Sequence, residues 1–540
     1  MIGLLAISDG WEQGERMLIS TRSLLVIVVA FIGWQAANSQ AATAAPATQP
    51  ALKMTVSPTR QITLSLGSKV LASGYWGLFD ATWHAIDVDQ FPLGSPPHSS
   101  VVQDSPTHAV IVDSYPNAEA TIDIKLDGED LRFAVHAKNM HPQLSLKNIA
   151  VGGLTFHFSR NASGTIASWH GSYLSAHGTT IFHPSLLQPL GEVFAHDDQF
   201  GFGAYSSSEF DRQSLFNTNF KKDGIIPAEC LVVFYTLRSV PAGGSVDVDT
   251  TFRISTDFSM PHLLEGYKKI YKAHFPAPLY HPDARPVAQF AAIDQSFITP
   301  ANPLGYNGPT RRLDSPAGTA AYVRLIAPAL EQAGALGIIF WSPGGVDPPM
   351  YPPDFDQFPK SVQRNIPSLV DGFARHHLRV GLCARCGDGV TREPGKEPQM
   401  YRLDVKNPAH MKTLMDRFDH AMQMGFDLFY LDSFGIDNPN DQEILKLIRD
   451  KVGPDVQLYT EFCTDMSLPY AGHYCEWREG GILWTSLDRY TTLRSLCPDS
   501  PWLCISRTDQ KVPAEFAKLG LTPLVEDLYS NRLPTTRPLP

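Results

Sequence analysis

The sequence has no excess of basic residues. Its 44 Lys and Arg residues stand against 55 Asp and Glu residues, which gives a formal net charge of -11 at pH 7. An acidic chain repels the phosphate backbone, so the composition argues against a nucleic-acid partner. A lone Cys-x-x-Cys pair, Cys383 and Cys386, has no second pair to complete a tetrahedral zinc site. We therefore expect neither a metal nor a cofactor.

The N-terminal apolar run, from Leu24 to Ile32, is too short to span a bilayer comfortably. It follows Arg22 and precedes small residues from Ala36 to Ala47, the order typical of a secretory signal peptide. We predict that residues 1–50 are a signal peptide and small-residue linker. The protein is then secreted or periplasmic, with no transmembrane segment after signal cleavage.

Seven cysteines in an exported chain permit disulfides but leave at least one thiol unpaired. Two pairs are close enough in sequence to form bridges across loops. These are Cys463 with Cys475, and Cys497 with Cys504.

The chain of 540 residues is long enough for about two to four domains. Residues 51–258 contain repeated stretches of alternating apolar and polar residues, of which residues 245–254 are the clearest, separated by turn signals. This pattern predicts an antiparallel β-sandwich. Residues 259–286 first show helical spacing and then several prolines, which predicts a linking helix and a stiff connector.

From residue 287 onward, predicted strands alternate with predicted helices. The eight strands are expected at 287–293, 336–341, 378–383, 426–431, 456–460, 481–485, 502–506 and 521–525, and the helices at 319–333, 362–376, 408–424, 441–452 and 513–519. This count and rhythm match a (β/α)8 TIM barrel over residues 287–540. A doubly wound sheet is the alternative, but no Gly-rich phosphate fingerprint follows the first strand.

The predicted fold therefore has many candidate site residues at one place, because the C-terminal ends of barrel strands converge on one mouth. The fourth strand is a buried apolar run that ends at Asp432, and the fifth is followed by Glu461. Other polar and aromatic residues at or near strand ends are Asp294, Trp341, Arg385, Asp388, Tyr430, Asp488 and Arg507. Carboxylates gathered in this way repel one another unless a substrate, a proton or an Arg offsets their charge.

Two carboxylates beside aromatic residues are what the cleavage of a glycosidic bond needs. Since Asp432 and Glu461 end neighbouring strands, we expect their carboxyl groups to lie about 5–6 Å apart, with Asp432 as nucleophile and Glu461 as acid/base. An alternative for Glu461 is a salt bridge with Arg385 or Arg507. The expected partner is an oligosaccharide, polysaccharide or glycoconjugate, bound by Asp294, Trp341, Arg385, Tyr430, Asp488 and Arg507.

An exported β-sandwich, a linking helix and a barrel whose fourth strand ends in Tyr430-Leu431-Asp432 resemble the sandwich-plus-barrel glycoside hydrolases that act on α-glycosides. These include the α-galactosidase and α-glucosidase clan and the endo-α-N-acetylgalactosaminidases. The resemblance implies that Asp432 is the nucleophile. The amylase-like and endo-acting pattern puts the acid on a Glu after strand five, here Glu461, whereas the α-galactosidase clan puts it on an Asp after strand six, here Asp488. Tyr430 stands where the amylase-like enzymes have an Arg.

A second class of function stays open on the sequence alone. A carbohydrate-binding protein without catalytic activity can use the same scaffold, because function depends on the site and not on the fold. The Asp-rich stretch from Asp437 to Asp441 has a calcium alternative, but we interpret it as an ordinary helix N-cap.

Overall fold

The structure is a computed structural model. It describes residues 51–80, 98–143, 145–146, 149–158, 166–168, 172–174, 192–197, 199–206, 215–223, 226–235, 240–291, 300, 313–341, 360–391, 399–432, 434, 441–461, 465–478, 481–483, 493–506, 524–525 and 535–536. The predicted signal peptide lies outside these residues. Among them, no helix is long and apolar enough to cross a membrane. Residues 52–540 form one compact unit, so the predicted boundaries at 258 and 286 stay predictions.

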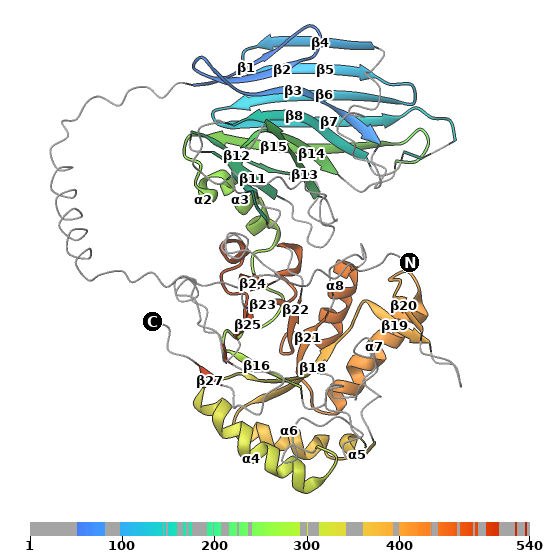
Figure 1. The fold of residues 1–540 in the computed structure, drawn as a ribbon. Coiled ribbons are helices and arrows are strands. Elements are labelled where there is room, and N and C mark those ends of the chain that lie inside the picture. The colour runs from blue at the N-terminus through green and yellow to red at the C-terminus, as the bar shows by residue number, and fades with distance from the viewer. Residues whose placement is uncertain are drawn as a thin grey trace, which may run out of the picture. The chain divides into compact units, whose positions relative to one another are not determined.

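The first part of this unit consists mainly of antiparallel strands (Figure 1). One sheet has the order β1 (Leu52–Val56), β2 (Ile62–Leu66), β3 (Lys69–Asp80), β8 (Ile149–His157), β14 (Ile226–Tyr235) and β13 (Leu215–Asp223). The other has the order β11 (Glu192–His196), β12 (Gly201–Tyr205), β15 (Ser245–Ser255), β7 (Asp130–Asn139), β6 (Ala118–Asp127), β5 (His108–Ser114) and β4 (His98–Ser105). β9 (Ile166–Ser168) and β10 (Ser172–Leu174) form a separate small pair.

Aromatic side chains from both sheets form one core. Trp76 of β3 stacks on Phe133 of β7 with ring centroids 4.4 Å apart, and Phe156 of β8 stacks on Phe202 of β12 at 3.9 Å. Burial alternates along the strands, as in β6, because successive side chains point to opposite faces of a sheet. The antiparallel sheets predicted for this region are therefore present, and they pack face to face.

We expect Phe133→Ala to be among the most damaging core substitutions. Phe133 is fully buried and contacts both Trp76 and Phe252, so truncation leaves a cavity and costs about 3–5 kcal/mol of stability. Native-state hydrogen exchange at the amides of β6 and β7 measures this loss. Val70→Ala is the matched control, because Val70 is 44% exposed on β3. Equal protection in the two variants would contradict the assignment of Phe133 to the core.

On the outer strands of the second sheet, His108 of β5 lies between the carboxylates of Asp104 on β4 and Asp123 on β6. His108 Nδ1 lies 2.7 Å from Asp104 Oδ2, and its Nε2 lies 2.9 Å from Asp123 Oδ1. The hydrogen bond to Asp104 is the main cause that raises the pKa of His108 above its ordinary value.

We expect this pair of contacts to stabilise the fold at low pH. Because the folded pKa is raised, the contribution is complete below the unfolded pKa of about 6.5 and is lost as pH rises through the folded pKa. An NMR titration of the His108 ring protons should give a midpoint above that of a model peptide. Asp104→Asn should lower the midpoint. A wild-type midpoint at or below the peptide value would refute the expectation.

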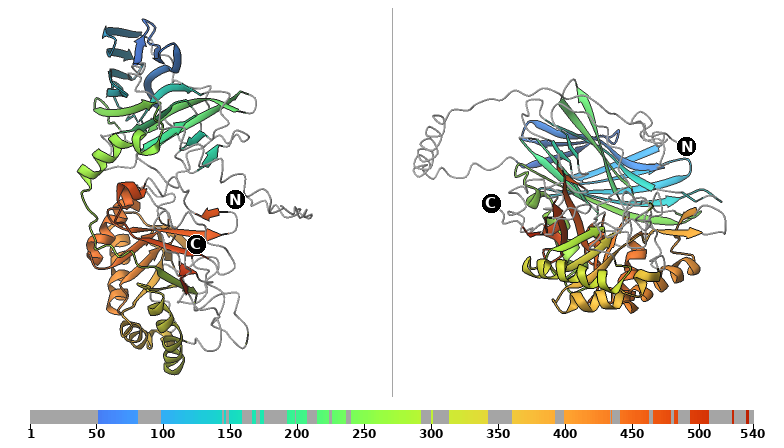
Figure 2. Two further views of the ribbon diagram at one scale, coloured as in Figure 1. Left: turned by 90° about the vertical axis from the view of Figure 1, so that its left-hand side faces the viewer. Right: turned by 60° about the horizontal axis from the view of Figure 1, so that its bottom comes forward.

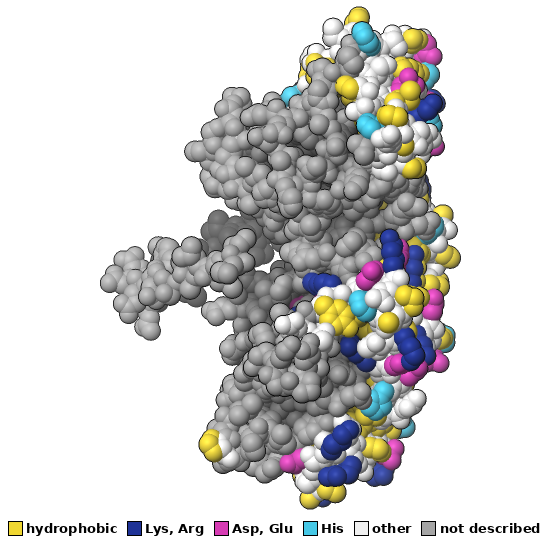
Figure 3. Space-filling view, turned by 90° about the vertical axis from the view of Figure 1, so that its right-hand side faces the viewer, with side chains coloured by type: hydrophobic (Ala, Val, Ile, Leu, Met, Phe, Trp, Pro, Cys, Tyr) yellow, Lys and Arg dark blue, Asp and Glu magenta, His cyan; other side chains and the backbone are white. Residues whose placement is uncertain are grey.

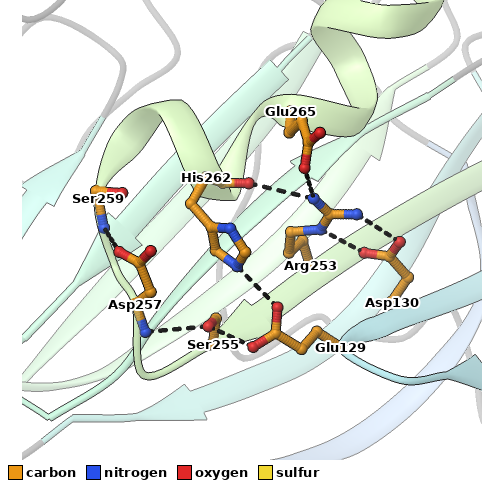
Figure 4. Close-up of polar contacts among 8 residues, drawn as sticks. All are labelled: Glu129, Asp130, Arg253, Ser255, Asp257, Ser259, His262 and Glu265. Atoms are coloured by element: carbon orange, nitrogen blue, oxygen red, sulfur yellow. Dashed lines mark hydrogen bonds and ion pairs between the residues drawn. The ribbon is translucent and has the colours of Figure 1, made fainter.

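Helical structure follows the sheets where the spacing of apolar residues predicts one linking helix, but it is divided into two short helices, α2 (Met260–Leu263) and α3 (Glu265–His274). A polar network holds them to the second sheet (Figure 4). Arg253 of β15 donates from Nε and Nη2 to the two oxygens of Asp130, both at 2.8 Å, and from Nη1 to Glu265 at 2.9 Å. His262 Nε2 lies 2.7 Å from Glu129 Oε2.

Helix α3 is also bonded to the segment that follows strand β22 (Gln457–Thr460). The hydroxyl of Tyr267 donates to the carboxylate of Asp465, and the hydroxyl of Tyr271 donates to the carbonyl of Asp465 at 2.7 Å. Asp465 is 1% exposed, so its polar atoms depend on hydrogen bonds from the protein, which also include one from Met466 N to Asp465 Oδ1 at 2.8 Å.

The second part of the unit contains a parallel, barrel-like sheet. Its order is β16 (Val287–Ala291), β17 (Gly337–Trp341), β18 (Arg379–Ala384), β21 (Leu428–Leu431), β22, β23 (Gly472–Arg478), β25 (Trp502–Ser506) and β26 (Leu524–Val525). All pairings along this path are parallel, and β16 also contacts β25, so the sheet is nearly closed. β27 (Thr535–Thr536) pairs with β26 in the opposite direction.

Helices lie along the outer side of this sheet (Figures 1 and 2). They are α4 (Pro316–Gln332), α5 (Lys360–Gln363), α6 (Ile366–Ala374), α7 (Pro408–Gln423) and α8 (Asp441–Val452). The predicted helices at 319–333, 362–376, 408–424 and 441–452 are confirmed, and the one at 513–519 lies outside the described residues. Ser315 and Asn407 cap α4 and α7, each followed by a proline at the first helical position.

The predicted sixth barrel strand at 481–485 is wrong. The strand that pairs in parallel with β22 and β25 is β23, and β24 (Gly481–Leu483) folds back antiparallel onto β23. The physical reason is that β23 mixes His, Glu and Arg with aromatic residues, so it lacks the continuous apolar run by which the other barrel strands are recognised.

The Cys497–Cys504 pairing that the sequence spacing permits is not formed, because Cys497 has a free thiol. Residues 501–506 extend into β25 instead of closing a loop, and they place Cys504 in backbone register with Cys475 of β23. Cys463 lies outside the described residues. Cys383 and Cys386 are also free.

Candidate active site

The parallel sheet separates two apolar cores. One lies inside the barrel and consists of Val287, Leu336, Ile339, Leu428, Tyr430, Tyr459, Tyr474 and Leu503, with Cys383 packed against it. The other lies on the helix side and includes Ala384, Phe429, Leu431 and Leu458. Because side chains alternate along a strand, the residues of these two cores show which positions of each strand face the inside of the barrel.

Three polar residues directly follow three register partners on neighbouring strands of this sheet. Ala384, Leu431 and Thr460 are register partners on β18, β21 and β22. The next residues on these strands are Arg385, Asp432 and Glu461. The backbone ladder continues through them, since Asp432 N donates to Ala384 O at 2.9 Å and Glu461 N donates to Leu431 O at 3.2 Å.

The alternation along each strand puts all three side chains on the inner side. Two residues before Arg385, Asp432 and Glu461 stand Cys383, Tyr430 and Tyr459, which belong to the inner core. Asp432 is 5% exposed and Glu461 is 8% exposed. The structure therefore brings the two predicted carboxylates to the same edge of the barrel on neighbouring strands.

The charges of Asp432 and Glu461 both affect the pKa values of two neighbouring groups, the Cys383 thiol and the Tyr430 hydroxyl. Burial raises the pKa of the Cys383 thiol well above its usual value, and the charges of Asp432 and Glu461 raise it further. Burial likewise raises the pKa of the Tyr430 hydroxyl, with Glu461, Tyr474 and Asp432 adding to the effect. Cys383 and Tyr430 thus stay neutral beneath the carboxylates, and neither supplies a thiolate or phenolate nucleophile.

Arg385 is bonded to Asp432. Its Nε donates to Asp432 Oδ2 at 2.9 Å, and the two side chains are 13% and 7% exposed. A charge-assisted hydrogen bond of this kind offsets the cost of burying the carboxylate and fixes its orientation. The role of Arg385 as a direct sugar contact stays a prediction.

The remaining predicted site residues are placed differently. Tyr430 is fully buried and contacts the ring of Tyr474, with centroids 4.9 Å apart. Trp341 is the last residue of β17, where its backbone pairs with Ala291 of β16. Asp294, Asp488 and Arg507 lie outside the described residues. Among the described residues, no group of three or more His, Cys, Asp or Glu side chains is arranged to hold a metal ion.

The sequence alone does not identify Tyr474 and Arg402 as neighbours of this site. Tyr474 lies on β23, whereas the apolar pattern predicts the sixth barrel strand at 481–485, so the sequence gives no sign that this side chain belongs to the inner core. Arg402 comes from a hairpin, β19 (Asp388–Thr391) and β20 (Gln399–Arg402), that was not predicted. In the sequence, the Arg and Asp three residues apart at 385 and 388 are a sign of an ion pair at this place.

No protein-family model and no curated protein matches the chain. Among solved structures, the chain is similar in fold to α-glycosidases. Matches include α-N-acetylgalactosaminidase NagBb from Bifidobacterium bifidum, in complex with GalNAc (12% identity, 89% of this chain and 88% of that chain, TM-score 0.58) and ligand-free (12%, 90% and 90%, 0.58). The galactosidase domain of an α-galactosidase–sucrose kinase matches at a TM-score of 0.43 (12%, 87% and 69%).

At this identity the likeness shows a shared fold. The predicted resemblance to sandwich-plus-barrel glycosidases acting on α-glycosides is confirmed at that level.

Proposed function

We propose that the protein is a retaining glycoside hydrolase acting on α-glycosides, with Asp432 as nucleophile and Glu461 as acid/base. The observation that supports this most is the row formed by Arg385, Asp432 and Glu461 at the C-terminal ends of three paired strands. In barrels of this kind the chemistry takes place at that end of the strands.

The spacing of paired strands favours retention of configuration. Neighbouring strands lie about 4.7–4.9 Å apart, and Asp432 and Glu461 occupy equivalent places on two strands that pair directly. Retaining enzymes hold their carboxyl groups about 5–5.5 Å apart, whereas inverting enzymes need about 6.5–9.5 Å to admit a water molecule. One strand spacing therefore matches the retaining geometry.

The reaction then has two steps. In the first, an oxygen of Asp432 attacks the anomeric carbon while protonated Glu461 gives its proton to the leaving oxygen, so the glycosidic bond breaks and a glycosyl ester forms. In the second, the Glu461 carboxylate takes a proton from water, and the water oxygen displaces Asp432 from the anomeric carbon. The proton returns to Glu461 and the carboxylate of Asp432 is restored.

The substrate that we propose is an α-linked galactose or N-acetylgalactosamine at the end of an oligosaccharide or glycoconjugate. The fold is shared with an α-N-acetylgalactosaminidase, which motivates this choice of sugar. Asp294, Trp341, Asp488 and Arg507 are further substrate contacts in this proposal, because each is at or near the end of a strand predicted from the sequence. We also propose that residues 1–50 direct export of the protein. The same proposal includes a β-sandwich domain followed in sequence by a full (β/α)8 barrel.

Aryl α- and β-glycosides of galactose, N-acetylgalactosamine and glucose provide the test. We expect hydrolysis of an α-glycoside with galacto configuration, and proton NMR should detect the α-anomer as the first product. Release of the β-anomer first would contradict the retaining mechanism. A protein that binds these sugars without hydrolysing any of them would instead be a carbohydrate-binding protein with an inactive barrel.

A further inference from the structure

Charged side chains continue the contact between Arg385 and Asp432 toward the surface. Arg385 Nη1 lies 3.7 Å from Asp388 Oδ2, and Arg402 Nη1 lies 3.2 Å from Asp388 Oδ1. Asp432, Arg385, Asp388 and Arg402 thus form a row of alternating charge, here called the ion-pair chain. On the face drawn in Figure 3, acidic and basic side chains lie next to one another among the described residues.

The exposed fraction of the side chains changes along the ion-pair chain. Asp432, Arg385 and Asp388 are 7%, 13% and 10% exposed, whereas Arg402 is 47% exposed. Water and salt screen nearly buried charges only weakly. The interaction energy therefore depends most on geometry at the inner end of the ion-pair chain, between Asp432 and Arg385. Arg385 lies between two carboxylates, and this limits the positions that its guanidinium group can take.

The hairpin β19–β20 supplies the outer half of the chain. Asp388 and Arg402 are register partners, so backbone pairing sets the contact between their side chains. Next to them Gly389 pairs with Tyr401, and a Cβ at Gly389 would meet the Tyr401 ring. Arg417 of α7 donates to the Asp388 carbonyl at 3.4 Å. Asp388 is therefore held by the hairpin and by a helix of the barrel.

We propose that Asp388 and Arg402 are positioning residues: they hold the guanidinium of Arg385, which in turn orients the Asp432 carboxylate for attack on the anomeric carbon. The inference rests on the proposed function of Asp432. Neither Asp388 nor Arg402 touches Asp432, and both act through Arg385. Because attack requires aligned orbitals, a displacement of about 1 Å reduces the rate about 100-fold.

Steady-state kinetics of Asp388→Asn and Arg402→Gln test the proposal on the aryl α-glycoside that the wild type hydrolyses. We expect Asp388→Asn to lower kcat about 100-fold and leave KM nearly unchanged, because orientation and not binding is lost. Arg402→Gln should cause a smaller loss, and Arg402→Lys should recover part of it. Arg364→Gln, at an exposed position, is the control and should match the wild type. Wild-type kcat in Asp388→Asn would overturn the proposal.

A crystal structure of Asp388→Asn separates this inference from the proposed function. We expect the distance from Arg385 Nε to Asp432 Oδ2, now 2.9 Å, to exceed hydrogen-bonding range. An unchanged distance overturns the inference even if the wild type is an active glycosidase. A lengthened distance supports the positioning role even if no glycoside is hydrolysed. If Asp388→Asn does not fold, Arg402→Gln takes its place, because this side chain is half exposed.

Discussion

Asp432→Asn should abolish turnover while leaving the fold intact. We expect Asp432→Asn to lower kcat about 10⁴-fold or more, because the amide cannot form the glycosyl ester on which the proposed mechanism depends. Asn has the shape of Asp, and its oxygen can still accept the hydrogen bond from Arg385 Nε. The loss is therefore one of chemistry, and sugar binding should persist.

The measurement combines kinetics with labelling of the nucleophile. A 2-deoxy-2-fluoro glycoside with a good leaving group should add one sugar mass to the wild-type protein, on the peptide that contains Asp432, and nothing to Asp432→Asn. Asp427→Asn is the matched control. Asp427 precedes the same strand at its opposite end and also lies near an Arg, with Arg379 Nη1 at 3.7 Å. A label on any other carboxylate would show that the nucleophile has been misassigned.

The sequence was sufficient to locate the inner pair of carboxylates, because each follows a short strand that is buried along its length. β21 has the continuous apolar composition of a strand buried on both faces, whereas β22 has Leu and Tyr between Gln and Thr and is also fully buried. The residue that follows such a strand lies at the edge where sites form. Asp432 and Glu461 could therefore be selected before any coordinates were known.

The surroundings of this pair could not be predicted in the same way. Arg402 comes close to Asp388 only because a hairpin pairs them, and neither strand of that hairpin has a distinctive apolar pattern. Tyr474 lies on β23, whose charged residues hide the strand. In the antiparallel part, alternation predicted strands such as β15, but the contact of Trp76 with Phe133 depends on the strand order of two sheets, which alternation does not encode.

The loss caused by Glu461→Ala should depend on the leaving group, which distinguishes an acid/base from a structural residue. For a poor leaving group we expect kcat/KM to fall about 10²–10⁴-fold, since the departing oxygen then lacks its proton. For an activated aryl glycoside the first step needs little protonation, so the fall should be smaller. The alkaline limb of the pH profile, which reports the proton on the acid, should disappear.

Azide provides the decisive measurement on the same variant. Without Glu461 no carboxylate activates water in the second step, and azide can replace water because it needs no deprotonation. We expect azide to restore turnover of Glu461→Ala and to yield a glycosyl azide of retained configuration. Glu443→Ala, at an exposed position on α8, should neither lose activity nor respond to azide. Full activity in Glu461→Ala, together with azide rescue of Asp488→Ala, would instead assign the acid to Asp488, as in the α-galactosidase clan.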